Sequence, residues 1–253
     1  MDLGLKDCVV LVTGSSSGIG RAAAVAFGAE GARVAITFHG NRAGAEETER
    51  RVTEAGGQTI VAHYDLADPG SIRSTIESVQ KAWGGLNVLV NNASPMVQGP
   101  TQQLFEDVPM EQWQSMLRGT LEGITLTIQC GLPLMRKSGW GRIVNISSDA
   151  ADSAPWPGLG PYATAKAGLH GLTRILAVEL GPANIVSNVL SLGPIQTERN
   201  QQRIPAEQQE QIRLHTPTRQ FITSEDVAAA IVFLGSQVNR QITGEIIHMT
   251  GGR

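Results

Sequence analysis

The chain has 253 residues, of which 41% are hydrophobic and 17% are charged, a composition typical of a folded globular domain. Lys and Arg number 20 against 23 Asp and Glu, so the net charge of −3 gives no electrostatic reason to bind nucleic acid or an anionic membrane. Two cysteines support neither a disulfide framework nor a cysteine zinc site, and the five histidines form no metal-binding motif. The apolar runs are far shorter than the ~18 residues of a membrane span. We therefore expect a cytoplasmic protein with a small-molecule partner, no metal, no nucleic acid and no membrane contact.

Short β-branched runs alternate with helical patterns along the whole chain, which favours βαβ units around a parallel sheet. No linker or repeat divides the sequence, so we predict one domain over residues 1–253, with a Rossmann-like, doubly wound, seven-stranded parallel sheet. The predicted strands are 8–12, 34–38, 59–63, 88–90, 142–146, 185–190 and 245–249. The predicted helices are 19–28, 43–55, 69–83, 111–136, 161–180 and 224–234.

The segment 193–220 is rich in Gln and contains Pro194, Pro205 and Pro217. It is too long for an ordinary connection between a strand and a helix. We predict a loop with a short helix that covers a site; the alternative is a solvated surface excursion.

A glycine-rich turn follows the first predicted strand and leads into the first helix. Glycines let the backbone approach a pyrophosphate, and the N–H groups at a helix start favour negative charge. The alternative is a Gly/Ser turn without a ligand. The letters also spell G-x-S-x-G with Ser16 as a hydrolase nucleophile, but in the twelve residues before Thr13 we expect no earlier strand that would carry an oxyanion-hole loop. The predicted phosphate cradle consists of Gly14, Ser15, Ser16, Ser17, Gly18, Ile19 and Gly20.

Tyr162 and Lys166 are four residues apart in a predicted helix, so they share one face. A neighbouring ammonium favours phenolate, which would let Tyr162 act as an acid/base; the alternative is a packed Tyr beside a solvated Lys. Ser148 follows the strand 142–146, at the strand end where open α/β sheets bind ligands. A hydroxyl there would hydrogen-bond a carbonyl, although Ser-Ser at a strand end is also ordinary turn chemistry.

Taken in order, these motifs resemble the short-chain dehydrogenase/reductase family over essentially the whole chain. The resemblance rests on Thr13-Gly14-x-x-x-Gly18-Ile19-Gly20, Asp65-Leu66, Asn91-Asn92-Ala93, Ser148, Tyr162-x-x-x-Lys166, Gly193 to Thr197, Gly244-Glu245 and Gly251-Gly252. It implies hydride transfer between nicotinamide and a carbonyl or alcohol, with Ser148 orienting the substrate oxygen and Tyr162 exchanging its proton. The cofactor contacts implied by the resemblance are Asp65 and Leu66 at the adenine, Asn92, Ala93 and Ser94 near the adenosine ribose, Tyr162 and Lys166 at the nicotinamide ribose, and Gly193, Ile195 and Thr197 at the carboxamide. It also implies a homotetramer formed through the helices 111–136 and 161–180.

The end of the second strand indicates which nicotinamide cofactor is used. An acidic residue there would bind a ribose 2′-hydroxyl and repel a 2′-phosphate, but this chain has Phe38, followed by His39, Asn41 and Arg42. We therefore predict NADP(H) as the cofactor. The alternative is NAD(H), which is favoured if Arg42 is only a surface charge.

Thr120 stands where the family usually has an Asn that helps to hold a helix irregularity and a water behind the lysine. We expect the Thr120 hydroxyl, or the carbonyl of its turn, to hold that water, with slower catalysis as the result. The alternative function is a nicotinamide-nucleotide-binding protein with little or no redox turnover. Ser94 and Leu192 are further departures from the family pattern, and neither touches the proposed chemistry.

The predicted pocket is mostly apolar and suits an apolar, ring-sized ketone or alcohol. Together with the hydride transfer that the resemblance implies, this predicts a carbonyl reductase, or ketoreductase. The predicted wall consists of Pro95, Met96, Val97, Ala154, Trp156, Pro157, Leu159 and the segment 194–214, with Arg203 at the rim.

Overall fold

The computed structural model describes residues 1–95, 103–153, 157–197 and 205–253. Within them lies a seven-stranded sheet of order β3-β2-β1-β4-β5-β6-β9, in which every neighbouring pair is parallel. Its strands are β1 (Val9–Val12), β2 (Arg33–Phe38), β3 (Gln58–His63), β4 (Val88–Asn91), β5 (Gly141–Ser148), β6 (Ile185–Leu192) and β9 (Ile246–Met249). The predicted doubly wound, single-domain Rossmann-like fold is confirmed, and each predicted strand is present with its ends shifted by up to two residues.

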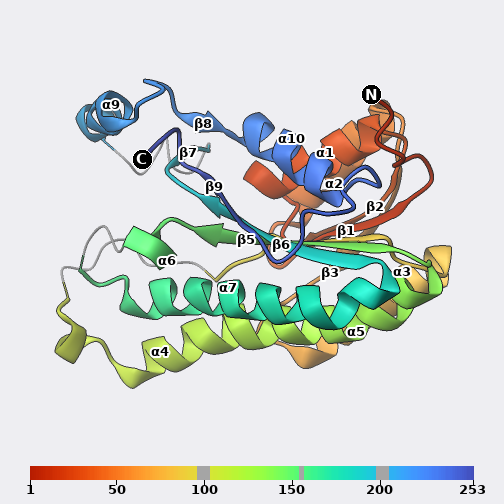
Figure 1. Ribbon diagram of the computed structural model, residues 1–253, viewed down its shortest axis with the longest axis horizontal. Helices are drawn as coiled ribbons and strands as arrows, with labels where there is room; N and C mark the ends of the chain where they lie inside the picture. Colours follow the sequence, from red (N-terminus) through yellow and green to blue (C-terminus); the bar gives the residue numbers. More distant parts are fainter. Residues whose placement is uncertain (96–102, 154–156, 198–204) are drawn as a thin grey trace.

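Helices cover both faces of this sheet (Figure 1). One layer contains α1 (Gly18–Ala29), α2 (Arg42–Glu54) and α10 (Ser224–Gly235), and the other contains α3 (Pro69–Trp83), α4 (Met110–Leu117), α5 (Gly123–Lys137) and α7 (Gly160–Leu180). Each layer has its own apolar core. Phe27 and Ile231 pack on one face of the sheet, and Ile128 and Leu169 pack on the other. Right-handed crossovers place helices in this way.

The helix predicted over 111–136 is not uniform. A π-helical turn, η2 (Arg118–Glu122), separates α4 from α5, and Gly123 N–H reaches back five residues to the Arg118 carbonyl. The apolar pattern continues through the turn, which is why the sequence indicates one unbroken helix.

Except for η3 (Gly181–Ala183), which lies where β6 begins, the smaller elements gather at the end of the sheet where the strands terminate (Figure 1). There α6 (Ala150–Ser153) follows β5, and β7 (Ile195–Gln196) pairs with β8 (Ile222–Thr223). The short helix expected within 193–220 is α9 (Ala206–His215). The 3₁₀ turns η1 (Phe105–Asp107) and η3 precede α4 and follow α7. Among the helices of the described ranges, none has the length and apolar content needed to cross a membrane.

Candidate active site

The glycine-rich turn between β1 and α1 forms an open cradle. Gly14 has φ +66°, and a Cβ on it would lie 3.0 Å from Ala93 Cα. A Cβ on Gly20 would lie 2.4 Å from the Gly14 carbonyl oxygen and 2.6 Å from Asn92 Nδ2. Both positions therefore require glycine because neighbouring backbone fills the space. Ser17 precedes α1 in extended conformation without a side-chain cap, so the first-turn N–H groups keep the capacity to bind an anion.

Two side chains that the sequence reasoning missed hold this turn. Thr37 at the end of β2 accepts a hydrogen bond from Gly14 N–H (2.8 Å), and its own N–H donates to Ser15 Oγ (2.8 Å). Arg21 on α1 donates to the Ser16 carbonyl (2.7 Å) and to Thr48 of α2 (3.1 Å). The Ser15 hydroxyl is thus used within the loop. No local pattern marks Thr37 or Arg21, because their partners come from other elements.

The predicted ribose and carboxamide contacts lie around the same cradle. Asn92 donates from Nδ2 to the Thr13 and Gly14 carbonyls (2.9 and 3.1 Å), and the Ala93 N–H donates to Thr13 Oγ1 (3.0 Å). Beyond β6, the Cγ2 of Thr197 lies 3.8 Å from the position of a Cβ on Gly18. The segment after β6 therefore passes close to the glycine turn. This proximity would let the segment and the turn bind the same dinucleotide.

The other predicted cofactor contacts lie in the segment after β6 and just beyond β3. Gly193 donates its N–H to the Met249 carbonyl (3.0 Å). Ile195 is buried in β7. Leu66 is buried against the start of α5, where its carbonyl would clash with a Cβ on Gly123.

The predicted adenine-end residues meet at the ends of β2 and β3. His39 Nδ1 lies 3.7 Å from Asp65 Oδ2, and the ring of Phe38 packs edge-on to that of His63 (5.6 Å between centroids). Asn41 caps α2 by accepting from Gly44 N–H (2.9 Å). Arg42 is the first residue of α2, is highly exposed, and donates to Glu46 (2.9 Å). Within the described residues, the Arg42 side chain therefore pairs with a surface carboxylate that a stronger anion could displace.

Ser148, Tyr162 and Lys166 come together at the carboxyl ends of the strands. Ser148 is the last residue of β5, and its hydroxyl interacts with the Tyr162 phenol. The Lys166 ammonium lies 5.7 Å from the centroid of the Tyr162 ring. It is buried and donates to the Ile146 carbonyl (2.8 Å).

Burial sets the protonation of this group. It raises the pKa of the Tyr162 phenol, an effect opposed by the Ser148 hydrogen bond and reinforced by Asp149. Burial also lowers the pKa of Lys166 to about 8, so at pH 7 the lysine is mostly charged while the phenol keeps its proton. The phenol is therefore a proton donor at pH 7, and the phenolate that the Tyr–Lys spacing favoured is not its prevailing form.

Thr120 lies in the π-helical turn and is fully buried. Its Oγ1 donates to Met116 Sδ (3.5 Å), one turn back on α4. The helix irregularity that the family's Asn helps to hold is therefore present without that Asn. Pro95 packs against this turn, because a Cβ on Gly119 would lie 2.7 Å from Pro95 Cγ.

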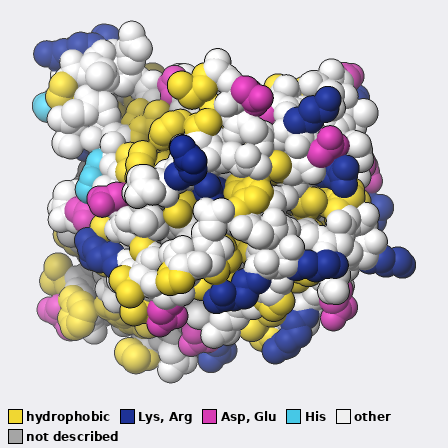
Figure 2. All heavy atoms as spheres, turned by 45° about the vertical axis from the view of Figure 1, so that its right-hand side comes forward, with side chains coloured by type: hydrophobic (Ala, Val, Ile, Leu, Met, Phe, Trp, Pro, Cys, Tyr) yellow, Lys and Arg dark blue, Asp and Glu magenta, His cyan; other side chains and the backbone are white. Residues whose placement is uncertain are grey.

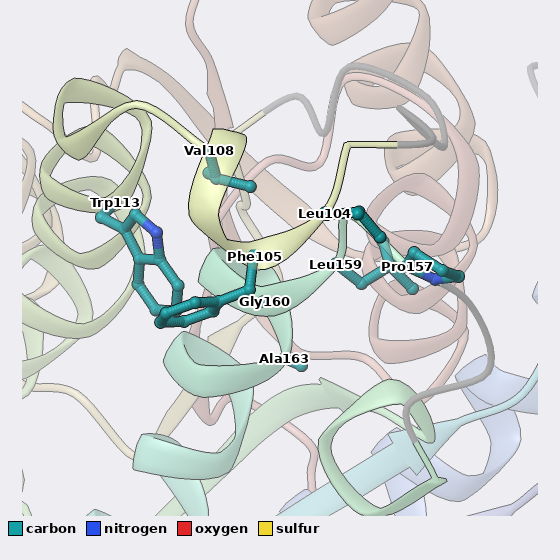
Figure 3. A pocket seen from close by; sticks show the side chains of 9 residues that line it. Leu104, Phe105, Val108, Trp113, Pro157, Leu159, Gly160 and Ala163 are labelled. Atoms are coloured by element: carbon teal, nitrogen blue, oxygen red, sulfur yellow. The ribbon is translucent and has the colours of Figure 1, made fainter.

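An apolar pocket of about 280 Å³ lies beside the first turn of α7 (Figure 3). Leu159 and Pro157 of the predicted wall line it, opposite Trp113 and Phe105, whose rings meet edge-on at 5.8 Å. The sequence reasoning missed its lining residues Leu104, Phe105, Val108 and Trp113, because they come from the region around η1 and α4. The predicted wall residues Met96, Val97, Ala154, Trp156 and Arg203 lie outside the described residues.

The residues present fit a nicotinamide dinucleotide. Three features lie at the carboxyl ends of the strands: a turn that a Cβ would block, an uncapped helix start, and a buried lysine beside a phenol. Among the described residues, no group of three or more His, Cys, Asp or Glu is arranged to hold a metal ion.

The comparisons with known proteins agree with this geometry. A family model described as enoyl-(acyl carrier protein) reductase matches residues 14–253. A 3-oxoacyl-[acyl-carrier-protein] reductase of Aquifex aeolicus is 36% identical over 256 residues, covering 100% of this chain and 99% of that protein. A D-beta-hydroxybutyrate dehydrogenase of Rhizobium meliloti is 34% identical over 258 residues, covering 96% of each. The chain belongs to the short-chain dehydrogenase/reductase family and is an oxidoreductase of that family.

Solved structures of the family superpose closely. A 7α-hydroxysteroid dehydrogenase complexed with NADH and 7-oxo-glycochenodeoxycholic acid matches with a TM-score of 0.92 and 29% identity, over 99% of this chain and 96% of that one. A short-chain dehydrogenase from Burkholderia cenocepacia in complex with NADP matches with a TM-score of 0.88 and 32% identity, over 100% and 99%. Relatives of this fold thus bind either cofactor.

Proposed function

We propose that the protein is an NADP(H)-dependent carbonyl reductase or alcohol dehydrogenase that acts on apolar, ring-sized ketones or alcohols, with Tyr162 as the acid/base. The observation that carries this is the meeting of Ser148, Tyr162 and Lys166 at the sheet edge that also holds the glycine cradle. The resemblance implied these roles, and the geometry is compatible with each of them.

The chain's residues divide the chemistry among them. The nicotinamide supplies or accepts the hydride when it is bound. The Ser148 hydroxyl orients the substrate oxygen, and the protonated Tyr162 phenol donates its proton to that oxygen as negative charge develops on it. Lys166 is fixed by the Ile146 carbonyl, and its ammonium stabilises the phenolate that forms after proton donation. In alcohol oxidation the same groups act in the opposite direction.

The preference for NADP(H) is supported by the end of β2, where the sequence has Phe38 instead of an acidic residue. In the described part of the chain, the exposed Arg42 side chain pairs with Glu46 on the surface. We propose that the 2′-phosphate replaces Glu46 as the partner of Arg42. Arg42→Gln should then weaken NADPH binding and leave NADH binding nearly unchanged. Equal or tighter binding of NADH by the wild type would contradict the preference.

The apolar pocket supports the substrate class. Its walls are carbon-rich, and its lining includes Gly160 and Ala163, which lie within two residues of Tyr162 in the chain. On the face shown in Figure 2, which lies away from the strand ends that carry Ser148, basic and acidic side chains both occur. The 3-oxoacyl reductase relatives make a 3-oxoacyl thioester a necessary member of any substrate panel.

We further propose a cytoplasmic homotetramer. Met110 on α4 and Ile175 and Val178 on α7 are exposed by 63%, 49% and 74%. Burying such side chains between subunits is favourable. Light scattering that reports a mass of about 27 kDa, near the 26.9 kDa of one chain, would contradict the tetramer.

The alternative, a nucleotide-binding protein without turnover, is favoured by one observation: the Thr120 hydroxyl faces Met116 rather than a relay. Fluorescence titration with NADPH and NADH, followed by a panel of ketones, quinones and 3-oxoacyl thioesters, separates the two functions. Nucleotide binding with ketone-dependent oxidation supports the reductase. Tight binding without oxidation across the panel supports the alternative.

A further inference from the structure

A polar cluster that neither the family motifs nor the proposed mechanism uses lies behind Ser148. Ser147 precedes Ser148 on β5, and its Oγ lies 2.9 Å from Nε2 of His170 and 3.4 Å from the Lys166 carbonyl oxygen. His170 Nδ1 lies 3.7 Å from Asp152 Oδ1. The other carboxylate oxygen of Asp152 lies 3.1 Å from His248 Nε2. Side chains from β5, α6, α7 and β9 thus meet directly behind the catalytic groups.

The order Ser147, His170, Asp152 imitates a hydrolase triad, but its environment excludes that chemistry. Ser147 is only 3% exposed, and its hydroxyl is enclosed by His170 and the Lys166 carbonyl. A nucleophile must reach a substrate carbonyl, and this one faces the interior. The cluster is therefore a support for neighbouring groups.

The hydrogen-bond directions in the cluster depend on the His170 ring. With Asp152 facing Nδ1, the proton of the neutral ring lies on Nδ1, and Nε2 accepts from the Ser147 hydroxyl. A second proton would make Nε2 a donor and turn the Ser147 hydroxyl toward the Lys166 carbonyl. The charged or titratable groups facing His170 are Asp152 of α6, His248 of β9 and Arg174 of α7. Burial lowers the pKa of His170, so the neutral arrangement prevails at pH 7.

We propose that Asp152 and His170 are positioning residues that act through Ser147 to hold Ser148 against Tyr162. Ser147 and Ser148 are adjacent residues at the carboxyl end of strand β5, and His170 lies on the helix that carries Tyr162. This inference rests on the proposed reductase function.

A second link runs through α6, the short helix that carries Asp152. The N–H of Ala150, at the start of α6, donates to Ser148 Oγ (3.2 Å). The contact of Asp152 with His170 ties this helix to α7. Loss of the cluster would therefore disturb both the backbone of Ser148 and a donor to its hydroxyl.

The kinetic test compares His170→Leu and Ser147→Ala with the wild type, using His248→Gln as the matched control. His248 touches the same carboxylate from β9 but does not contact Ser147. His170→Leu and Ser147→Ala should each lower kcat for ketone reduction about tenfold, the equivalent of one hydrogen bond, with KM and NADPH affinity nearly unchanged. The double variant should be no slower than either single one.

Two further variants separate positioning from general structural damage. His170→Gln retains a side chain that can accept from Ser147 and should recover most of kcat. Because it does not titrate, it should also lose the fall of kcat that protonation of His170 causes at acid pH in the wild type. Asp152→Asn should alter the same acid limb of the pH profile. Wild-type kcat and an unchanged acid limb in His170→Leu would overturn the inference.

A measurement that needs no turnover covers the case in which the reductase function itself fails. If none of the substrates in the panel makes the wild type oxidise NADPH, the proposed function fails. The inference is then tested by titrating the Tyr162 phenol in the free protein. The ultraviolet absorbance of phenolate is followed, with Tyr162→Phe as the blank and circular dichroism as the check of folding. His170→Leu and Ser147→Ala should raise the midpoint by ~0.5–1 pH unit, since the phenol loses the Ser148 hydrogen bond that lowers its pKa. Midpoints equal to that of His248→Gln would overturn the inference.

Discussion

Replacing Gly20 by alanine tests the close packing of the phosphate cradle. The new Cβ would lie 2.4 Å from the Gly14 carbonyl oxygen, whereas ordinary contacts begin at about 3.4 Å, so α1 and the turn must separate by about 1 Å. Overpacking of this kind costs ~1–3 kcal/mol, which for a chain of this length lowers Tm by roughly 2–12 °C. The displaced turn also carries the N–H groups proposed to bind pyrophosphate, so NADPH affinity should fall at least ~10-fold.

Thermal denaturation and NADPH fluorescence titration of Gly20→Ala measure both effects. Gly181→Ala is the matched control: Gly181 is a glycine in a helical turn where a Cβ meets nothing within 4 Å. The control should keep wild-type affinity and gain up to ~1 kcal/mol of stability. Wild-type Tm and affinity in Gly20→Ala would refute the packing argument.

Three further predictions concern the site and its surroundings. Thr120→Asn changes the side-chain volume little and should raise kcat by up to ~10-fold by restoring the family's relay residue, and a lower kcat would show that Thr is tuned to this site. Ala163→Leu fills part of the apolar pocket and should raise KM for bulky ketones while sparing small ones; parallel changes for both would place the substrate elsewhere. Burial lowers the pKa of His170 below its ordinary 6.5, so the unfolded state binds a proton at this residue more readily than the folded state does. The stability that the neutral His170 contributes is therefore lost as the pH falls from 7 toward 5. Denaturant unfolding should therefore show a smaller acid loss in His170→Gln than in the wild type, and equal losses would contradict this origin.

The strands could be predicted from sequence because each is a short β-branched run bounded by turn residues, and the alternation with helices fixes a parallel sheet. The local pattern over 111–136 predicted one uniform helix, and only the family resemblance at Thr120 pointed to an irregularity there, which the structure shows as the π-helical turn Arg118–Glu122. Ser148, Tyr162 and Lys166 were assigned by motif and lie together in the structure.

The contacts that support the site depend on tertiary structure. Thr37 reaches Gly14 from the neighbouring strand, and Arg21 joins α1 to α2. His170 and Asp152 are separated by 18 positions and meet only because α6 folds back on α7. Sequence spacing within one element carries no signal for such pairs.

The central claim is tested most directly by ketone-dependent oxidation of NADPH, measured side by side for the wild type and Tyr162→Phe. The account predicts turnover by the wild type, loss of turnover in Tyr162→Phe by a factor of at least ~10² and unchanged NADPH affinity, because the variant removes only the proton donor. Equal turnover by the two proteins would contradict the role of Tyr162 and, with it, the proposed mechanism.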